Sequence, residues 1–202
     1  LSFINSVNNQ ILILFAIVLI TCILSDFYFI DSNLTTPFII TTIVSSIITC
    51  IGIPQLQKIK IKQIIREEGP KNHFLKQGTP TMGGIFFVPI GIIISNLIYF
   101  NKENYEVILT LSFVIISFLL IGFIDDLLSL KKQFNTGLKS NQKINFQTFI
   151  SLIFIIICAS NNLLPNSIQI ANEIFYIGNI IYPLGIFVLL AESNSTNLTD
   201  GL

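Results

Sequence analysis

Six long apolar stretches are the feature of this sequence that most constrains its fold. A helix that crosses the roughly 30 Å hydrocarbon core of a bilayer needs about 20 mainly apolar residues, and each stretch is close to that length. The sequence therefore predicts an all-α polytopic membrane bundle with about six transmembrane helices. The stretches cover Ile11–Phe29, Leu34–Ile53, Gly83–Phe100, Val107–Ile124, Ile144–Ser160 and Ile174–Ala191.

The composition agrees with a membrane protein. Hydrophobic residues make up 52% of the chain and charged residues only 11%, whereas soluble domains carry about 25% charged residues. Zero net charge argues against a nucleic-acid-binding protein, which normally carries a net positive charge. The cysteines Cys22, Cys50 and Cys158 each stand alone in an apolar stretch, so we expect small buried hydrophobic residues and neither a disulfide nor a zinc site.

The ends of the sequence suggest an incomplete protein. The chain starts at Leu1 without a methionine and stops at Leu202 inside a polar motif. We expect residues 1–202 to form one integral membrane domain and to be the N-terminal part of a longer fold.

Basic residues are unevenly distributed between the apolar stretches. Ten of the 11 Lys and Arg residues lie between stretches two and three or between stretches four and five, whereas Lys102 lies in the acidic turn Asn101–Glu106. By the positive-inside rule, loops 54–82 and 127–143 are predicted to be cytoplasmic and loop 101–106 to be outside. The ten are Lys58, Lys60, Lys62, Arg66, Lys71, Lys76, Lys131, Lys132, Lys139 and Lys143.

A first polar motif, Gly78–Gly84 (Gly-Thr-Pro-Thr-Met-Gly-Gly), leads directly into the third stretch. Thr81 is predicted to be the N-cap of that helix, and the glycines allow a tight turn and a close approach to another group. The positive end of the helix dipole would then lie beside Lys71, His73 and Lys76, which favours an anionic phosphate. The alternative is an ordinary capped helix start.

A second motif, Asp125-Asp126, directly follows the apolar stretch Val107–Ile124. Adjacent carboxylates repel each other, and we expect them at the negative end of the helix dipole, where a compensating charge is required. A magnesium ion would supply it, because Mg²⁺ prefers carboxylate oxygens together with substrate phosphates. The alternative is that the pair only ends the helix and is neutralised by Lys131 and Lys132.

A third motif, Asn194–Leu202, is rich in side-chain hydrogen-bonding groups and contains an Asp-Gly turn signal. Alone it would be a generic polar loop. Its position gives it weight, because the predicted topology places three polar clusters, at the ends of three helices, on one membrane face. A transporter more often places its ionisable residues near the bilayer midplane, whereas these clusters lie where a soluble anionic substrate could meet a lipid headgroup.

Taken together, these motifs resemble those of the polyprenyl-phosphate N-acetylhexosamine-1-phosphate transferases, most closely the bacterial phospho-N-acetylmuramoyl-pentapeptide branch. The resemblance runs from about Pro54 to the end, and the first stretch carries no motif. It rests on Lys76–Gly84, Gly122–Asp126, Asn135–Leu138 followed by Lys143, and Asn194–Leu202.

The resemblance implies an enzyme of peptidoglycan synthesis. It would transfer phospho-MurNAc-pentapeptide from UDP-MurNAc-pentapeptide to undecaprenyl phosphate, giving UMP and undecaprenyl-pyrophosphoryl-MurNAc-pentapeptide (lipid I), with Mg²⁺ required. The expected location is the bacterial inner membrane, as a multi-pass protein in contact with membrane lipid, with its active site on the cytoplasmic face. No nucleic-acid partner is expected, and a homodimer is left open.

The same resemblance implies roles for individual residues. Asp125 corresponds to the carboxylate that deprotonates the lipid phosphate, and Asp126 to its acidic partner and metal ligand. Lys76 and Thr81 would line the nucleotide and phosphate region. The start of the loop that holds the uridine would be Asn197, Asp200, Gly201 and Leu202.

The chain departs from the family pattern in two ways. Ser129 stands where the family commonly has a lysine, whose phosphate contact Lys131 or Lys132 would have to supply. The family's third aspartate and its histidine-rich loop would lie beyond Leu202, so the chain alone is expected to be inactive. Two alternatives stay open: a polyprenyl-phosphate GlcNAc-1-phosphate transferase, which the form of the first motif disfavours, and a non-catalytic membrane scaffold or transporter.

Overall fold

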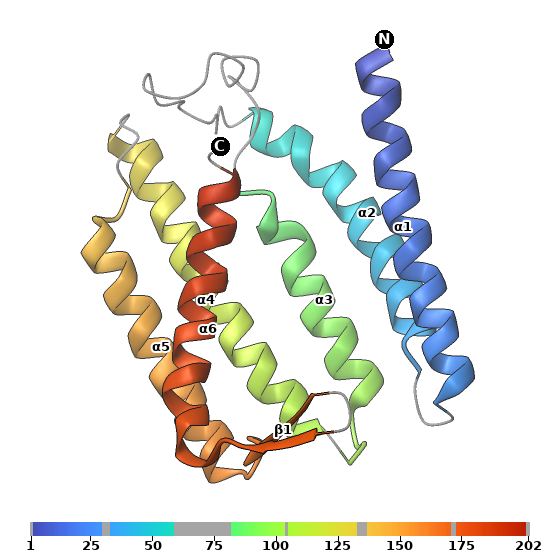
Figure 1. The fold of residues 1–202 in the computed structure, drawn as a ribbon. Helices are drawn as coiled ribbons and strands as arrows, with labels where there is room; N and C mark the ends of the chain where they lie inside the picture. The colour runs from blue at the N-terminus through green and yellow to red at the C-terminus, as the bar shows by residue number, and fades with distance from the viewer. Residues whose placement is uncertain are drawn as a thin grey trace.

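The described residues form an open bundle of six α-helices with one small β-hairpin (Figure 1). A computed structural model describes residues 2–29, 33–58, 82–103, 105–132, 137–170 and 173–200. The predicted all-α membrane bundle is confirmed apart from the hairpin. The helices are α1 (Ser2–Tyr28), α2 (Thr35–Lys58), α3 (Gly84–Tyr99), α4 (Tyr105–Lys132), α5 (Ser140–Ser160) and α6 (Ile181–Asp200); between α5 and α6 lie β1 (Ser167–Ile170), β2 (Glu173–Tyr176) and the 3₁₀ turn η2 (Gly178–Ile180).

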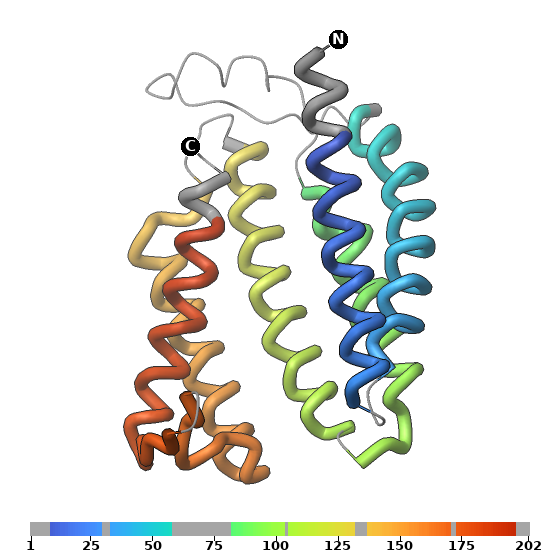
Figure 2. The backbone as a smooth tube through the Cα atoms, turned by 45° about the vertical axis from the view of Figure 1, so that its right-hand side comes forward, coloured from blue at the N-terminus to red at the C-terminus, as the bar shows by residue number. Residues whose placement is uncertain are grey.

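Each helix packs against the next one along the chain and runs in the opposite direction (Figures 1 and 2). The starts of α3 and α5 therefore lie at the same end of the bundle as the ends of α2, α4 and α6. We call this end the motif end, because the described parts of the sequence motifs lie there, and the opposite end the hairpin end. The predicted gathering of the motifs at one end of the molecule is thus present in the fold.

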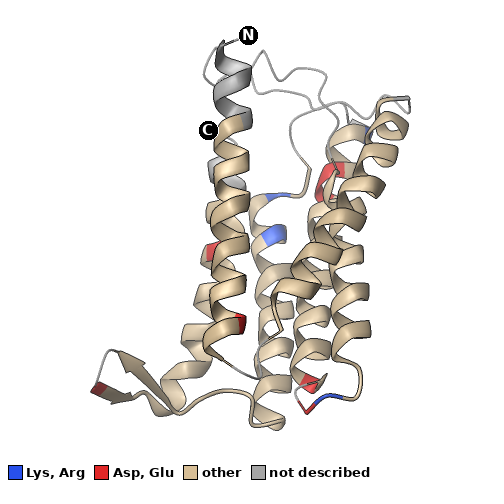
Figure 3. Ribbon diagram, turned by 90° about the vertical axis from the view of Figure 1, so that its right-hand side faces the viewer, with Lys and Arg blue, Asp and Glu red and all other residues tan. Residues whose placement is uncertain are grey.

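By length and apolar composition, four of the described helices could each cross a membrane: α1, α2, α4 and α5. Helix α3 is a shorter apolar helix of 16 residues. The described helices are mostly uncharged along their length, as the long tan stretches in Figure 3 show. Large hydrophobic side chains cover their outer surface, with Phe27 79% and Leu97 72% exposed. Such a surface suits lipid tails, which are as apolar as the side chains themselves.

The cysteine prediction holds only in part. The three cysteines are free; Cys158 is buried and Cys22 half-buried, but Cys50 is exposed. The expectation that Cys50 would be buried was wrong because its side chain lies on the outer apolar surface of α2.

The sixth predicted span differs most from the structure. Its expected first residues, Ile174–Tyr176, belong to β2, which pairs antiparallel with β1 so that Ser167 lies opposite Tyr176. Helix α6 begins only at Ile181, which places Pro183 in its first turn, where a missing N–H group costs no hydrogen bond. The helix then continues past the expected end at Ala191 to Asp200.

Asp26 ties the end of α1 to the start of α2. Its carboxylate accepts hydrogen bonds from the main-chain N–H groups of Leu34 at 2.8 Å and Thr35 at 2.9 Å. The first N–H groups of a helix have no partner within the helix, so this carboxylate caps α2. A charged residue within an apolar stretch therefore has a structural task at the hairpin end.

Candidate active site

The two adjacent carboxylates lie inside α4 and not at its end. The helix continues from Asp126 to Lys132, about two further turns. The expectation that the apolar span ends at Ile124 was therefore wrong, because leucines continue the helical pattern and the basic pair Lys131-Lys132 suits the negative end of the dipole. Compensation for the carboxylates must come from a neighbouring element.

Helix α5 supplies that compensation to Asp125. The Nζ atom of Lys143 lies 3.0 Å from Asp125 Oδ2, in an ion pair whose side chains are only 16% and 23% exposed. The main-chain N–H of Leu138 donates to the other oxygen, Oδ1, at 2.8 Å. Because Leu138 precedes the N-cap residue Lys139 of α5, the carboxylate lies beside the positive end of a helix dipole.

Gly137 packs directly on Asp125. A Cβ added at Gly137 would overlap the Oδ1 atom and the main-chain oxygen of Asp125, and it would lie 2.8 Å from Ser129 Oγ. Ser129 follows Asp125 by one helical turn, so both face the turn that leads into α5. The serine that replaces the family's lysine thus belongs to the wall of this site, and its small side chain leaves room for the turn to close.

The start of α3 differs from its predicted capping. Gly83 occupies the N-cap position and makes no side-chain capping bond. Thr81 is therefore not the N-cap; it lies outside the described residues, as do Lys71, His73 and Lys76. The preceding residue, Met82, is buried and has a left-handed φ of 68°. A Cβ at Gly83 would meet no atom within 4 Å, so packing within the described chain does not require glycine there.

The third motif is helical and not a loop. Residues 194–200 form the last turns of α6, and polar side chains in this segment donate to carbonyls of their own helix. Asn194 Nδ2 donates to Leu190 O at 2.8 Å, and Thr196 Oγ1 donates to Glu192 O at 2.8 Å. The backbones of Asn197 and Asp200 belong to these turns, but their side chains, Gly201 and Leu202 are outside what the structure describes.

Comparisons with known proteins agree with this arrangement. The profile of glycosyl transferase family 4 matches residues 108–202, and signature 1 of the phospho-N-acetylmuramoyl-pentapeptide-transferases matches residues 76–88. A phospho-N-acetylmuramoyl-pentapeptide-transferase of Prochlorococcus marinus (strain NATL2A) is 78% identical over the whole chain. The chain belongs to this transferase family. It is a multi-pass membrane protein of that family.

More distant relatives carry the same name. One from Prochlorococcus marinus (strain MIT 9313) is 44% identical over 88% of this chain and 48% of its own length. One from Synechococcus sp. (strain CC9311) is 41% identical over 88% of this chain and 48% of its own length. The strain NATL2A relative is covered over 54% of its length, so the chain spans about half the length of the curated relatives it matches.

The described residues fit a magnesium ion only together with a substrate. Among the residues that the structure places, no three His, Cys, Asp or Glu side chains gather in one cluster. Two carboxylates are enough for Mg²⁺ when phosphate oxygens and waters complete its six ligands. Asp126 is the candidate ligand that the family resemblance implies, and the Lys143 ammonium lies against Oδ2 of the neighbouring Asp125.

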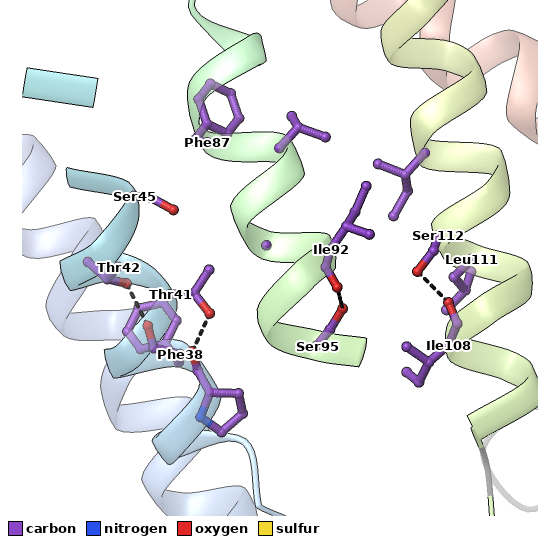
Figure 4. Close-up of a pocket in the computed structure, with 14 residues that line it drawn as sticks. Phe38, Thr41, Thr42, Ser45, Phe87, Ile92, Ser95, Ile108, Leu111 and Ser112 are labelled. Atoms are coloured by element: carbon purple, nitrogen blue, oxygen red, sulfur yellow. Dashed lines mark hydrogen bonds between the residues drawn. The ribbon is translucent and has the colours of Figure 1, made fainter. Parts of the chain in front are cut away.

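A cavity in the described chain lies away from this site. It has a volume of about 680 Å³ and is lined by α2, α3 and α4 toward the hairpin end (Figure 4). Most of its hydroxyls donate to carbonyls of their own helices, as Ser95 does to Ile92 O at 2.9 Å and Ser112 to Ile108 O at 2.7 Å. The cavity is therefore apolar in character and does not suit a nucleotide or phosphate.

Sequence reasoning missed Gln147, which is 1% exposed in α5. Its side chain bonds to two residues of α6, Ser193 and Asn194. The available signal was a polar residue in an apolar stretch, four positions after Lys143, which places both on one helix face.

Proposed function

We propose that the full-length protein transfers phospho-MurNAc-pentapeptide from UDP-MurNAc-pentapeptide to undecaprenyl phosphate. An oxygen of the lipid phosphate forms a bond to the phosphorus that carries the sugar, while the bond between the two donor phosphates breaks and UMP leaves. The product is lipid I. The observation that carries this proposal is Asp125, which lies at the motif end of a membrane helix with a protein donor on each of its oxygens.

Asp125 is well placed to act as a base toward the lipid phosphate. The Lys143 ammonium and the Leu138 N–H fix the orientation of the carboxylate. Each carboxylate oxygen keeps a further lone pair, so the group can still accept the proton of the incoming phosphate. Its position at the membrane surface suits an acceptor whose polyprenyl tail lies in the bilayer.

Bringing a phosphate up to a diphosphate sets one anion against another, so the site needs positive charge. We infer that Asp126 holds Mg²⁺, which when bound would neutralise part of the charge on the donor diphosphate. Lys76 and Thr81 would line the nucleotide and phosphate region. Uridine would be held by the segment that starts with Asn197, Asp200, Gly201 and Leu202.

The same proposal fixes location and orientation. The motif end, with ten of the 11 basic residues in its two connections and their flanking helix ends, would face the cytoplasm of a bacterial inner membrane. The UDP-linked donor is charged and cannot cross the bilayer, so the site would face the compartment that contains the donor.

The deciding experiment replaces each carboxylate by its amide in the full-length protein. Asp125→Asn and Asp126→Asn keep the size of each side chain and remove the mutual repulsion. Asp125→Asn also leaves the Lys143 ammonium without its anion, so we expect a lower melting temperature for that variant in detergent. In both variants we expect UMP release per folded enzyme to fall about 10²-fold or more, the scale of a positioned acid–base group.

A matched control uses the same helix. Glu106→Gln removes an exposed carboxylate from the first turn of α4 at the hairpin end, and normal turnover is expected. Near-normal turnover in both aspartate variants would refute the catalytic assignment. Faster use of UDP-GlcNAc than of UDP-MurNAc-pentapeptide by the wild type would instead favour the GlcNAc-1-phosphate transferase.

A further inference from the structure

Gln147 joins α5 to the polar end of α6 from a fully buried position. Its Nε2 donates to Ser193 Oγ at 2.8 Å, and its Oε1 accepts from Asn194 Nδ2 at 2.9 Å. The side chain is only 1% exposed, so both ends of its amide are used within the protein. A buried amide with two specific partners fixes the geometry of the helices that contact it.

A second contact between α5 and α6 requires the same alignment of the two helices. A Cβ added at Gly185 of α6 would lie 2.6 Å from Ile155 Cδ1 of α5, so the helices approach closely there. Ile155 follows Gln147 by eight residues, and Gly185 precedes Ser193 by eight. In an antiparallel pair these two contacts therefore specify one alignment, and a slip of α6 would break both.

Helix α5 also holds the proposed base. Lys143 precedes Gln147 by one turn and pairs with Asp125 of α4 at 3.0 Å. One face of α5 thus contacts the carboxylate motif through Lys143 and the third motif through Gln147. Four residues of helix separate these contacts by about 6 Å along the axis.

We propose that Gln147 is a positioning residue that sets the height and rotation of the polar end of α6 relative to Asp125. Asn197 lies three residues after Asn194, on the next turn toward the motif end, and Asp200 ends the helix. The amide of Gln147 would thereby fix the end of α6 relative to α5, the helix that also holds the partner of Asp125. This inference rests on the proposed transferase function.

Stability alone is a weak explanation for this amide. Hydrogen bonds between membrane helices contribute little net stability on average, and an apolar side chain of similar size would fill the same space. A positioning role instead predicts a kinetic effect specific to the nucleotide donor.

The test is Gln147→Met in the full-length enzyme, assayed by UMP release with varied UDP-MurNAc-pentapeptide. We expect kcat/KM for the donor to fall about 10-fold to 100-fold, mainly through a higher donor KM, because small misplacements of binding groups have effects of this size. The KM for undecaprenyl phosphate should stay near the wild-type value. The matched control is Thr148→Val, since the Thr148 hydroxyl donates to Ile144 O of its own helix at 2.8 Å.

The outcomes distinguish a failure of the positioning role of Gln147 from a failure of the proposed transferase function. Gln147→Met with wild-type donor KM, or with kcat reduced only in proportion to the folded fraction, would overturn the positioning role. If that variant does not fold, Ser193→Ala decides in its place: a raised donor KM supports the role and an unchanged one refutes it. Failure of the proposed function would look different, because the wild-type enzyme itself would release no UMP from this donor.

Discussion

Gly137→Ala is the substitution whose effect follows most directly from the contacts of the site. The added Cβ would overlap two oxygens of Asp125 and would lie 2.8 Å from Ser129 Oγ. One of those oxygens belongs to the main chain of α4, which cannot yield without bending the helix. The turn at Gly137 must therefore move away from Asp125 and take the Leu138 N–H with it.

The effect of Gly137→Ala on stability and on rate can be estimated from the hydrogen bond that this turn donates to Asp125. The 2.8 Å bond from Leu138 N to Asp125 Oδ1 would be lost, and a hydrogen bond to a charged group contributes about 1.5–3 kcal/mol to the free energy of unfolding. A displacement of about 1 Å near reacting groups lowers a rate about 10²-fold, which corresponds to about 2.7 kcal/mol in the activation barrier. Backbone strain adds nothing, because the φ of Gly137 lies outside the left-handed region.

The assay compares kcat for UMP release and thermal stability in detergent between Gly137→Ala and Gly122→Ala. Gly122 lies one turn before Asp125 on α4, and a Cβ there would meet no atom within 4 Å. An alanine inside a helix stabilises it by about 0.5–1 kcal/mol relative to glycine, so the control should be active and at least as stable. Wild-type turnover and melting temperature in Gly137→Ala would refute the reasoning that this glycine lets the turn close on Asp125.

Three further predictions concern other parts of the chain. Lys143→Met leaves the half-buried carboxylate of Asp125 without its cation, so turnover should fall at least about tenfold and the melting temperature should drop, whereas an unchanged rate would contradict the ion pair's role. Asp26→Ala removes the cap of α2 and should lower the free energy of unfolding by about 0.5–2 kcal/mol without changing the donor KM. In intact cells, an impermeant thiol reagent should label Lys102→Cys but not Lys139→Cys; the reverse pattern would invert the proposed topology.

The positions of most helices could be predicted from the sequence. Apolar runs bounded by polar residues mark α1 to α5 to within a few residues at most ends, because crossing a membrane requires length and apolarity and little else. The same signal cannot locate a helix end when leucines and lysines continue the pattern, as they do after Asp126. It also cannot show that Glu173–Tyr176 pairs as a strand, since a short apolar run suits strand and helix alike.

The candidate site could be predicted only as a set of motifs. Asp125 was recognisable from its neighbours in sequence, but its partners Leu138 and Lys143 depend on how the turn before α5 folds back. Gln147 was missed because its importance lies in contacts with residues 46 and 47 positions away. Local sequence gives no access to such long-range contacts.

The location of Asp125 inside α4 changes the electrostatic argument from the sequence, which placed this carboxylate at the negative end of its own helix. At the end of α4 the carboxylate would face the unpaired carbonyls of the last turn and be destabilised. Asp125 instead lies about two turns before that end, so those carbonyls point away from it. The chain then reverses so that α5 begins beside Asp125, bringing a main-chain N–H, the positive end of a second dipole and the Lys143 ammonium to one carboxylate. An anionic lipid phosphate that approached Asp125 would therefore meet positive potential from α5 as well as the negative charge of α4. It follows that the packing of α4 against α5 is itself part of the proposed catalytic apparatus, since separating them would remove the base's orientation and its compensating charge together.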